Sequence, residues 1–169
     1  FVSLQTNLGL HYYARGLYSL AIPAWEAAWE KGKHATAQNG KVVADRAVGE
    51  LIKMYARLGR MDRLRPLLEE VDKRPLLGSA GELVSAGRQG LWLMENRPGD
   101  AFRCGPLALA RAAKPGVGVQ NYASKTSALR STTDGTSLAQ LTDLARDTKL
   151  AFQPAFRSAG AAVIVPSVV

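Results

Sequence analysis

One apolar pattern occurs twice in the first half of the chain, and it constrains the fold more than any other feature. Leu51 stands 43 positions after Leu8. The same shift superimposes six further pairs: Tyr12 and Tyr55, Gly16 and Gly59, Tyr18 and Met61, Ala21 and Leu64, Trp25 and Leu68, and Ala28 and Val71. Apolar residues three, four and seven positions apart form one face of a helix, and a glycine between two such runs permits a reversal. The pattern therefore predicts two helical hairpins.

The boundaries of these helices follow from the ends of each apolar run. We expect helices over residues 4–15, 18–31, 41–58 and 61–72, and a further helix over 79–95 whose apolar side chains need a neighbour to cover them. Asn39 and Gly40 form a pair that favours turns and predict a break before the second hairpin. Gly9 and Ala21 have little bulk, so we expect the first two helices to cross closely with these residues facing each other.

The first hairpin resembles a tetratricopeptide repeat. Leu8-Gly9, Tyr12, a turn glycine at Gly16 and alternating aromatic and alanine positions stand at that repeat's offsets. The resemblance implies a helical array over residues 1–95 that holds a peptide or a neighbouring domain in a concave groove. With two repeats the groove is shallow, and the array then buttresses the domain that follows. The aromatic residues are expected to pack between helices rather than to contact a ligand.

Composition excludes several classes of protein. There are 22 basic and 14 acidic residues, a net charge of +8, but the basic residues are spread singly, so no specific nucleic-acid binding is expected. No apolar run is long enough to span a membrane. One cysteine and two histidines, His11 and His34, provide neither a disulfide nor an all-protein metal site. We expect no cofactor.

The one cysteine lies where a reactive thiol could form. Pro98 and Gly99 indicate a turn, and Pro106 suits the first turn of a helix, which places Cys104 at a helix start. Unpaired backbone N–H groups and the helix dipole stabilise a thiolate there, and Arg103 adds a positive charge. Cys104 is thus the candidate catalytic nucleophile. The alternative is a buried, inert cysteine.

Residues 96–169 resemble the bacteriocin-processing (double-glycine leader) cysteine peptidases, a papain-like family. Cys104-Gly105-Pro106-Leu107-Ala108-Leu109 is similar to the nucleophile segment of that family, and Gly135-Thr136-Ser137-Leu138 to a helix further along, with a strand after it around Lys149-Leu150. The segment 161–169 resembles the strand that leads to the catalytic histidine. The resemblance implies a papain-like α+β domain that cleaves a peptide or partner protein. Joined to a helical array, it resembles bacterial envelope or secreted proteins; the compartment of this chain stays open.

The sequence also departs from that family. The oxyanion-stabilising glutamine expected six residues before the cysteine is replaced by Pro98, which has no donor, so Asn96 or Arg97 would have to take its place. The catalytic histidine and its orienting Asp or Asn would lie beyond Val169. Without a base the chain alone is expected to be inert.

The expected fold is mainly α: hairpins over 1–95, then the helical part of the papain-like domain over 96–169 with one or two terminal strands, 152–156 and 161–165. The open edges of those strands predict a cover, either the remainder of the polypeptide or a second chain. Residues 115–133 are expected to form a loop over Cys104. Three functions stay open: a peptidase portion, a non-catalytic peptide-binding domain of the same fold, and a plain tetratricopeptide-like scaffold.

Overall fold

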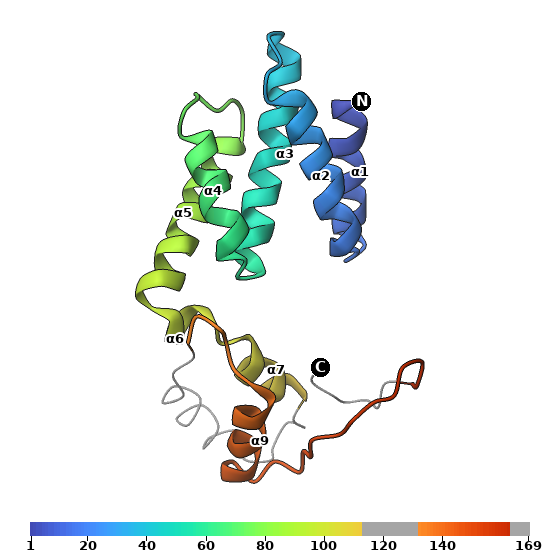
Figure 1. The fold of residues 1–169 in the computed structure, drawn as a ribbon, viewed down its shortest axis with the longest axis vertical. Helices are drawn as coiled ribbons and strands as arrows, with labels where there is room; N and C mark the ends of the chain where they lie inside the picture. The colour runs from blue at the N-terminus through green and yellow to red at the C-terminus, as the bar shows by residue number, and fades with distance from the viewer. Residues whose placement is uncertain (113–131, 163–169) are drawn as a thin grey trace. The chain divides into compact units, whose positions relative to one another are not determined.

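The computed structural model is mainly helical, as the sequence predicts, and it describes residues 1–112 and 132–162 (Figure 1). The chain divides into two compact units, Phe1–Trp92 and Leu93–Val169. The first unit holds the helical hairpins. The second holds the cysteine, so each unit is described by itself.

Helical hairpins make up the first unit. The helices are α1 (Val2–Ala14), α2 (Tyr18–Gly32), α3 (Gln38–Arg57), α4 (Met61–Val71) and, as far as Trp92, α5 (Ala80–Asn96). Each lies within a few residues of its expected range, so the hairpin prediction is confirmed. α1, α2 and α3 pack side by side, and α4 lies against α3 (Figure 1).

The two hairpin turns have the same backbone geometry, which explains why the glycines recur 43 positions apart. Gly16 and Gly59 have φ of +73° and +68°, the left-handed region that only glycine enters without strain. In both turns the N–H one residue after the glycine donates to a carbonyl five residues earlier, Leu17 to Tyr12 and Arg60 to Tyr55, each at 2.9 Å. Each helix therefore ends in a Schellman motif.

The core of the first unit is formed by the repeated positions. Ala21, Trp25 and Ala28 are fully buried, and their counterparts Leu64, Leu68 and Val71 are at most 5% exposed. Trp25 is thus a packing residue, as expected.

The expected pairing of Gly9 with Ala21 is wrong. A Cβ on Gly9 would lie 2.3 Å from Nε1 of Trp25, so the glycine makes room for the indole instead. The indole N–H donates to the carbonyl of Thr6, 3.2 Å away. Periodicity placed both residues on the contacting faces, but the length of the tryptophan side chain decides which residue reaches the gap.

The break expected at Asn39 and Gly40 is also absent, because both residues lie in the first turn of α3. The helix begins one turn earlier, after Ala37, which has extended backbone angles. A glycine in a helix costs up to about 1 kcal/mol. Burial of ten residues along the 20-residue helix outweighs that cost.

The second unit contains α6 (Pro98–Ala101), α7 (Cys104–Ala112) and α9 (Leu138–Asp147). Its apolar cluster joins α7 to α9 and the residues after it: Leu109, Leu144, Ala145 and Leu150, with Ala110 and Phe152 at the edge. A capping box begins α9. Ser137 Oγ accepts from the N–H of Gln140 at 3.2 Å, and the Ser137 N–H donates to Oε1 of Gln140 at 2.8 Å.

The predicted strand over residues 152–156 is not formed. Within 132–162 the structure has one isolated β-bridge, between Thr132 and Gly135, and no strand. A strand needs a partner for its N–H and C=O groups, and no described segment supplies one. Phe156 is 95% exposed. The strand expected around 149–150 is replaced by the end of α9, where Lys149 has φ of +58°. Most of the other expected strand, 161–165, and of the loop 115–133 lies outside the described residues.

Candidate functional site

Cys104 lies at the first helical position of α7, as the sequence predicts. The N–H of Leu107 donates to the carbonyl of Arg103 at 3.0 Å, which makes Arg103 the N-cap residue. The Cys104 side chain is exposed and forms no disulfide. The alternative of a buried structural cysteine is therefore wrong, and the thiol is open to reagents.

The structure packs the helix that carries Cys104 against the helix that follows Gly135. α7 packs against α9. The contact includes Gly105, where an added Cβ would lie 3.2 Å from a methyl group of Leu141 and 3.3 Å from Cβ of Thr136. Glycine next to the cysteine thus lets the start of α7 approach the start of α9 closely.

Asn96 and Arg97, the candidates for an oxyanion donor, lie before this helix, next to Pro98, which stands where the resemblance implies a glutamine. Arg97 is the N-cap residue of α6. Asn96 is the last residue of α5 and has an exposed side chain. Pro98 is the first residue of α6, a position that suits proline because no N–H is needed there. Pro98 therefore cannot donate a hydrogen bond to an oxyanion.

Neither histidine of the sequence belongs to the unit that carries Cys104. His11 is in α1, and His34 follows α2. Both side chains are exposed. A histidine base for the thiol is therefore not among residues 93–169.

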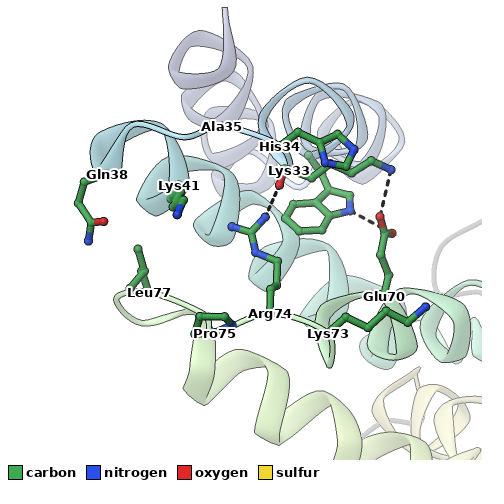
Figure 2. Close-up of a pocket in the computed structure, with 11 residues that line it drawn as sticks. Lys33, His34, Ala35, Gln38, Lys41, Glu70, Lys73, Arg74, Pro75 and Leu77 are labelled. Carbon is green, nitrogen blue, oxygen red and sulfur yellow. Dashed lines mark hydrogen bonds and ion pairs between the residues drawn. The ribbon is translucent and has the colours of Figure 1, made fainter.

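The first unit contains a cavity of about 650 Å³ at the ends of α2 and α4 and along the loops that follow them (Figure 2). Its lining includes three lysines, one arginine and one histidine, but a single acidic residue. They are Lys33, His34, Lys41, Lys73 and Arg74, with Glu70. The cavity is thus predominantly cationic.

Arg74 forms one wall of this cavity and holds three segments together. Its guanidinium donates to Oδ1 of Asp45 at 2.5 Å. It also donates to the carbonyl of Lys33 (Figure 2). Asp45 is fully buried in α3, and its other oxygen accepts from the N–H of Leu77 at 2.9 Å. We call this the Asp45–Arg74 latch. It fixes the loop after α4 onto α3 and onto the end of α2.

Lys33 and Glu70, which also line this cavity, belong to a second charged cluster. Lys33 Nζ lies 2.8 Å from Glu30 and 3.0 Å from Glu70, and Glu70 also accepts from the indole N–H of Trp29 at 3.2 Å. The carboxylates of Glu30 and then Glu70 raise the pKa of Lys33. Burial opposes ionisation of Glu70, but the hydrogen bonds from Lys33 and Trp29 outweigh it and hold its pKa below the ordinary value.

A neighbouring cavity of about 390 Å³ shares Trp29 and Glu70 with the first. Part of its lining is apolar, from Leu51, Pro66 and Leu67. The Tyr55 hydroxyl donates to Glu26 at 2.6 Å in this cavity. The two cavities together combine a cationic wall with adjacent apolar space.

The sequence analysis missed both cavities. Asp45 carried the one signal that could have found the latch, because it lies between the apolar residues Ala44 and Ala47 on the buried face of α3. A charged residue on such a face needs a partner. The partner stands 29 positions away, beyond the reach of helical periodicity.

No family model, curated protein or solved structure matches this chain. Within residues 1–112 and 132–162, no three metal-ligating side chains lie close enough together to hold an ion. In the same ranges no helix combines the length and the apolar character that crossing a bilayer requires.

Proposed function

We propose that the second unit belongs to a papain-like cysteine peptidase module, with Cys104 as the nucleophile, and that the helical hairpins hold a peptide or partner protein for it. The observation that carries the proposal is the packing of α7 on α9 around Gly105, with the thiol exposed at the first position of α7. These are the two segments on which the resemblance to the bacteriocin-processing peptidases rests. If both segments belong to one peptidase domain, they must pack against each other, as α7 and α9 do.

The chemistry follows from the thiol. Sγ of Cys104 attacks the carbonyl carbon of a peptide bond as the thiol proton passes to a base, and the C–N bond breaks to release an amine and leave a thioester. Water then hydrolyses the thioester and restores the thiol. A positioned base contributes on the order of 10²–10⁴ to the rate. Because residues 93–169 contain no histidine, we expect the 169-residue chain alone to carry out the attack slowly.

A stoichiometric acylation assay tests the nucleophile without requiring the base. p-Nitrophenyl acetate transfers its acetyl group to a thiolate and releases one p-nitrophenolate per site. Free imidazole supplies a base from solution. Imidazole also hydrolyses the ester by itself, so its release without protein is subtracted. We then expect one equivalent of p-nitrophenolate per chain, released faster with imidazole, and no such equivalent from Cys104→Ala.

The matched control has one exposed cysteine in the middle of a helix instead of at its start. The double variant Cys104→Ala and Ser85→Cys places it at an exposed position in the middle of α5. The proposal expects Cys104 to react clearly faster than this displaced thiol. Equal rates would mean that the position of Cys104 contributes nothing.

A non-catalytic peptide- or protein-binding scaffold is the second candidate. One observation favours it: Pro98 has no donor where the resemblance implies a glutamine. Under this alternative, acylation at Cys104 equals that of the displaced thiol, and peptide binding is unchanged in Cys104→Ala.

A further inference from the structure

We propose that the cationic cavity at the ends of α2 and α4 binds an acidic peptide segment, through Lys41 and Lys73 on either side of Arg74. The proposal concerns the first unit and does not depend on the chemistry of Cys104. It rests on the charges of the cavity, on which of them are already paired, and on their placement.

Two of the four lysine and arginine side chains in the cavity are already neutralised. Lys33 is bound to Glu30 and Glu70, and Arg74 is bound to the buried Asp45. These pairs hold the wall in place. The cavity is therefore built before any ligand arrives, which lowers the ordering cost of binding.

The remaining two cations are unpaired among residues 1–112 and 132–162. Lys41, in the first turn of α3, and Lys73, just after α4, both line the cavity, and neither has an ion pair or a hydrogen bond from its ammonium group within the described parts of the chain. Each offers three N–H donors. A carboxylate reaching either lysine would gain a charge-assisted hydrogen bond without displacing one.

The arrangement favours an extended ligand with more than one carboxylate. Lys41 and Lys73 lie on opposite sides of Arg74 in Figure 2. A peptide strand with alternate acidic residues can place one carboxylate at each lysine. Its apolar side chains would find space in the neighbouring cavity beside Leu51 and Leu67.

The same cavity is poorly suited to nucleic acid. Single strands are held by stacking bases on exposed aromatic rings, but Trp29 is only 2% exposed and lies under the Arg74 guanidinium, 5.2 Å from its ring centroid. The carboxylates of Glu30 and Glu70, 62% and 40% exposed, would repel closely spaced phosphates. A peptide can instead place its carboxylates away from them.

Fluorescence anisotropy with a labelled peptide tests the proposal on the 169-residue chain. The probe is fluorescein-Gly-Glu-Gly-Glu-Leu-Gly, compared with the same peptide carrying Gln in place of both Glu residues. We expect binding of the Glu peptide and little binding of the Gln peptide. Loss of two charge-assisted contacts in Lys41→Gln with Lys73→Gln is expected to raise Kd by about tenfold.

The control is Lys31→Gln combined with Lys53→Gln, because these exposed lysines carry the same charge and do not line the cavity. We expect this pair to leave Kd nearly unchanged. Equal weakening by both double variants would overturn the proposal, since the attraction would then come from net charge alone. No binding of the Glu peptide would also overturn it.

Two competitors distinguish other sources of negative charge. We expect inorganic phosphate at millimolar concentration to leave the peptide bound. Displacement by phosphate at the concentration of the peptide would show a small-anion site instead. Tighter binding of a six-nucleotide oligothymidylate that weakens in Lys41→Gln with Lys73→Gln would replace the peptide with nucleic acid. Circular dichroism of each variant checks that the helices are retained.

Discussion

Replacing Gly9 with alanine tests the packing of the first hairpin at its tightest point. In a helix this substitution normally stabilises by about 1 kcal/mol, because glycine loses more backbone entropy on folding. Here the new Cβ would lie 2.3 Å from Nε1 and 2.5 Å from Cδ1 of Trp25, well inside van der Waals contact. The indole must move, although it is fully buried.

The size of the effect follows from what that movement breaks. Overpacking a filled core costs about 1–3 kcal/mol. Displacing the indole also endangers its hydrogen bond to the carbonyl of Thr6, and an unsatisfied buried donor costs about 1–3 kcal/mol. If both costs apply in full, then after the helix gain of about 1 kcal/mol Gly9→Ala destabilises the first unit by about 1–5 kcal/mol. Each kcal/mol lowers Tm by roughly 4–8 °C for a unit of this size. Gly9→Leu, which adds more bulk, is expected to cost at least as much.

Thermal unfolding followed by circular dichroism and by tryptophan fluorescence measures this shift. Gly81→Ala in α5 is the matched control, because no atom lies within 4 Å of its added Cβ and its φ is not in the left-handed region. It is expected to raise Tm slightly through helix propensity alone. If Gly9→Ala were as stable as Gly81→Ala, the packing of Trp25 on Gly9 would be refuted.

Three further predictions concern single side chains. Asp45→Ala leaves Arg74 without its carboxylate partner and is expected to cost about 2–3 kcal/mol in urea unfolding, less than a fully buried pair because the Arg74 side chain is 20% exposed; an unchanged midpoint would contradict the latch. Burial, and then the hydrogen bond to Glu26, raise the pKa of Tyr55 above the ordinary value of about 10, so the folded state keeps this proton longer than the unfolded state and stability falls as pH rises above about 10. Tyr55→Phe is expected to flatten that alkaline decline in a pH series of unfolding midpoints, and an identical slope would argue against it. Lys149→Gly is expected to stabilise by roughly 0.5–1 kcal/mol, because Lys149 ends α9 with φ of +58°; a lower Tm in this variant would count against the relief of backbone strain.

Local patterns in the sequence predicted α1 to α5 and the two glycine turns that follow α1 and α3. Gly16 and Gly59 are informative because a turn with positive φ favours glycine, so the residue type itself indicates the turn. Ser137 is informative in the same way, since its capping box with Gln140 is encoded within four residues. Such features need no knowledge of the rest of the fold.

What the sequence did not predict depends on distant partners. Two phenylalanines suggested a strand over residues 152–156, but Pro154 between them has no N–H for a ladder. β structure also depends on pairing with another segment, and the described residues provide none. The residues around Arg74 in the sequence do not indicate that it pairs with Asp45, which lies 29 positions earlier. At the candidate catalytic site, the position of Cys104 at a helix start was predictable, whereas its exposure and the contact of Gly105 with α9 required the fold.

The Asp45–Arg74 latch also determines how the first unit can be divided. Helical repeats usually behave as a row of modules, each coupled only to its nearest neighbour, so that terminal modules can be deleted at helix ends. Here the loop after α4 reaches back to both hairpins, since Arg74 contacts the carbonyl of Lys33 as well as Asp45. A fragment ending at Val71 would contain every residue of the two hairpins and still lose the groups that satisfy Asp45. The smallest segment expected to fold and unfold cooperatively therefore extends at least to Leu77, beyond the end of α4 at Val71.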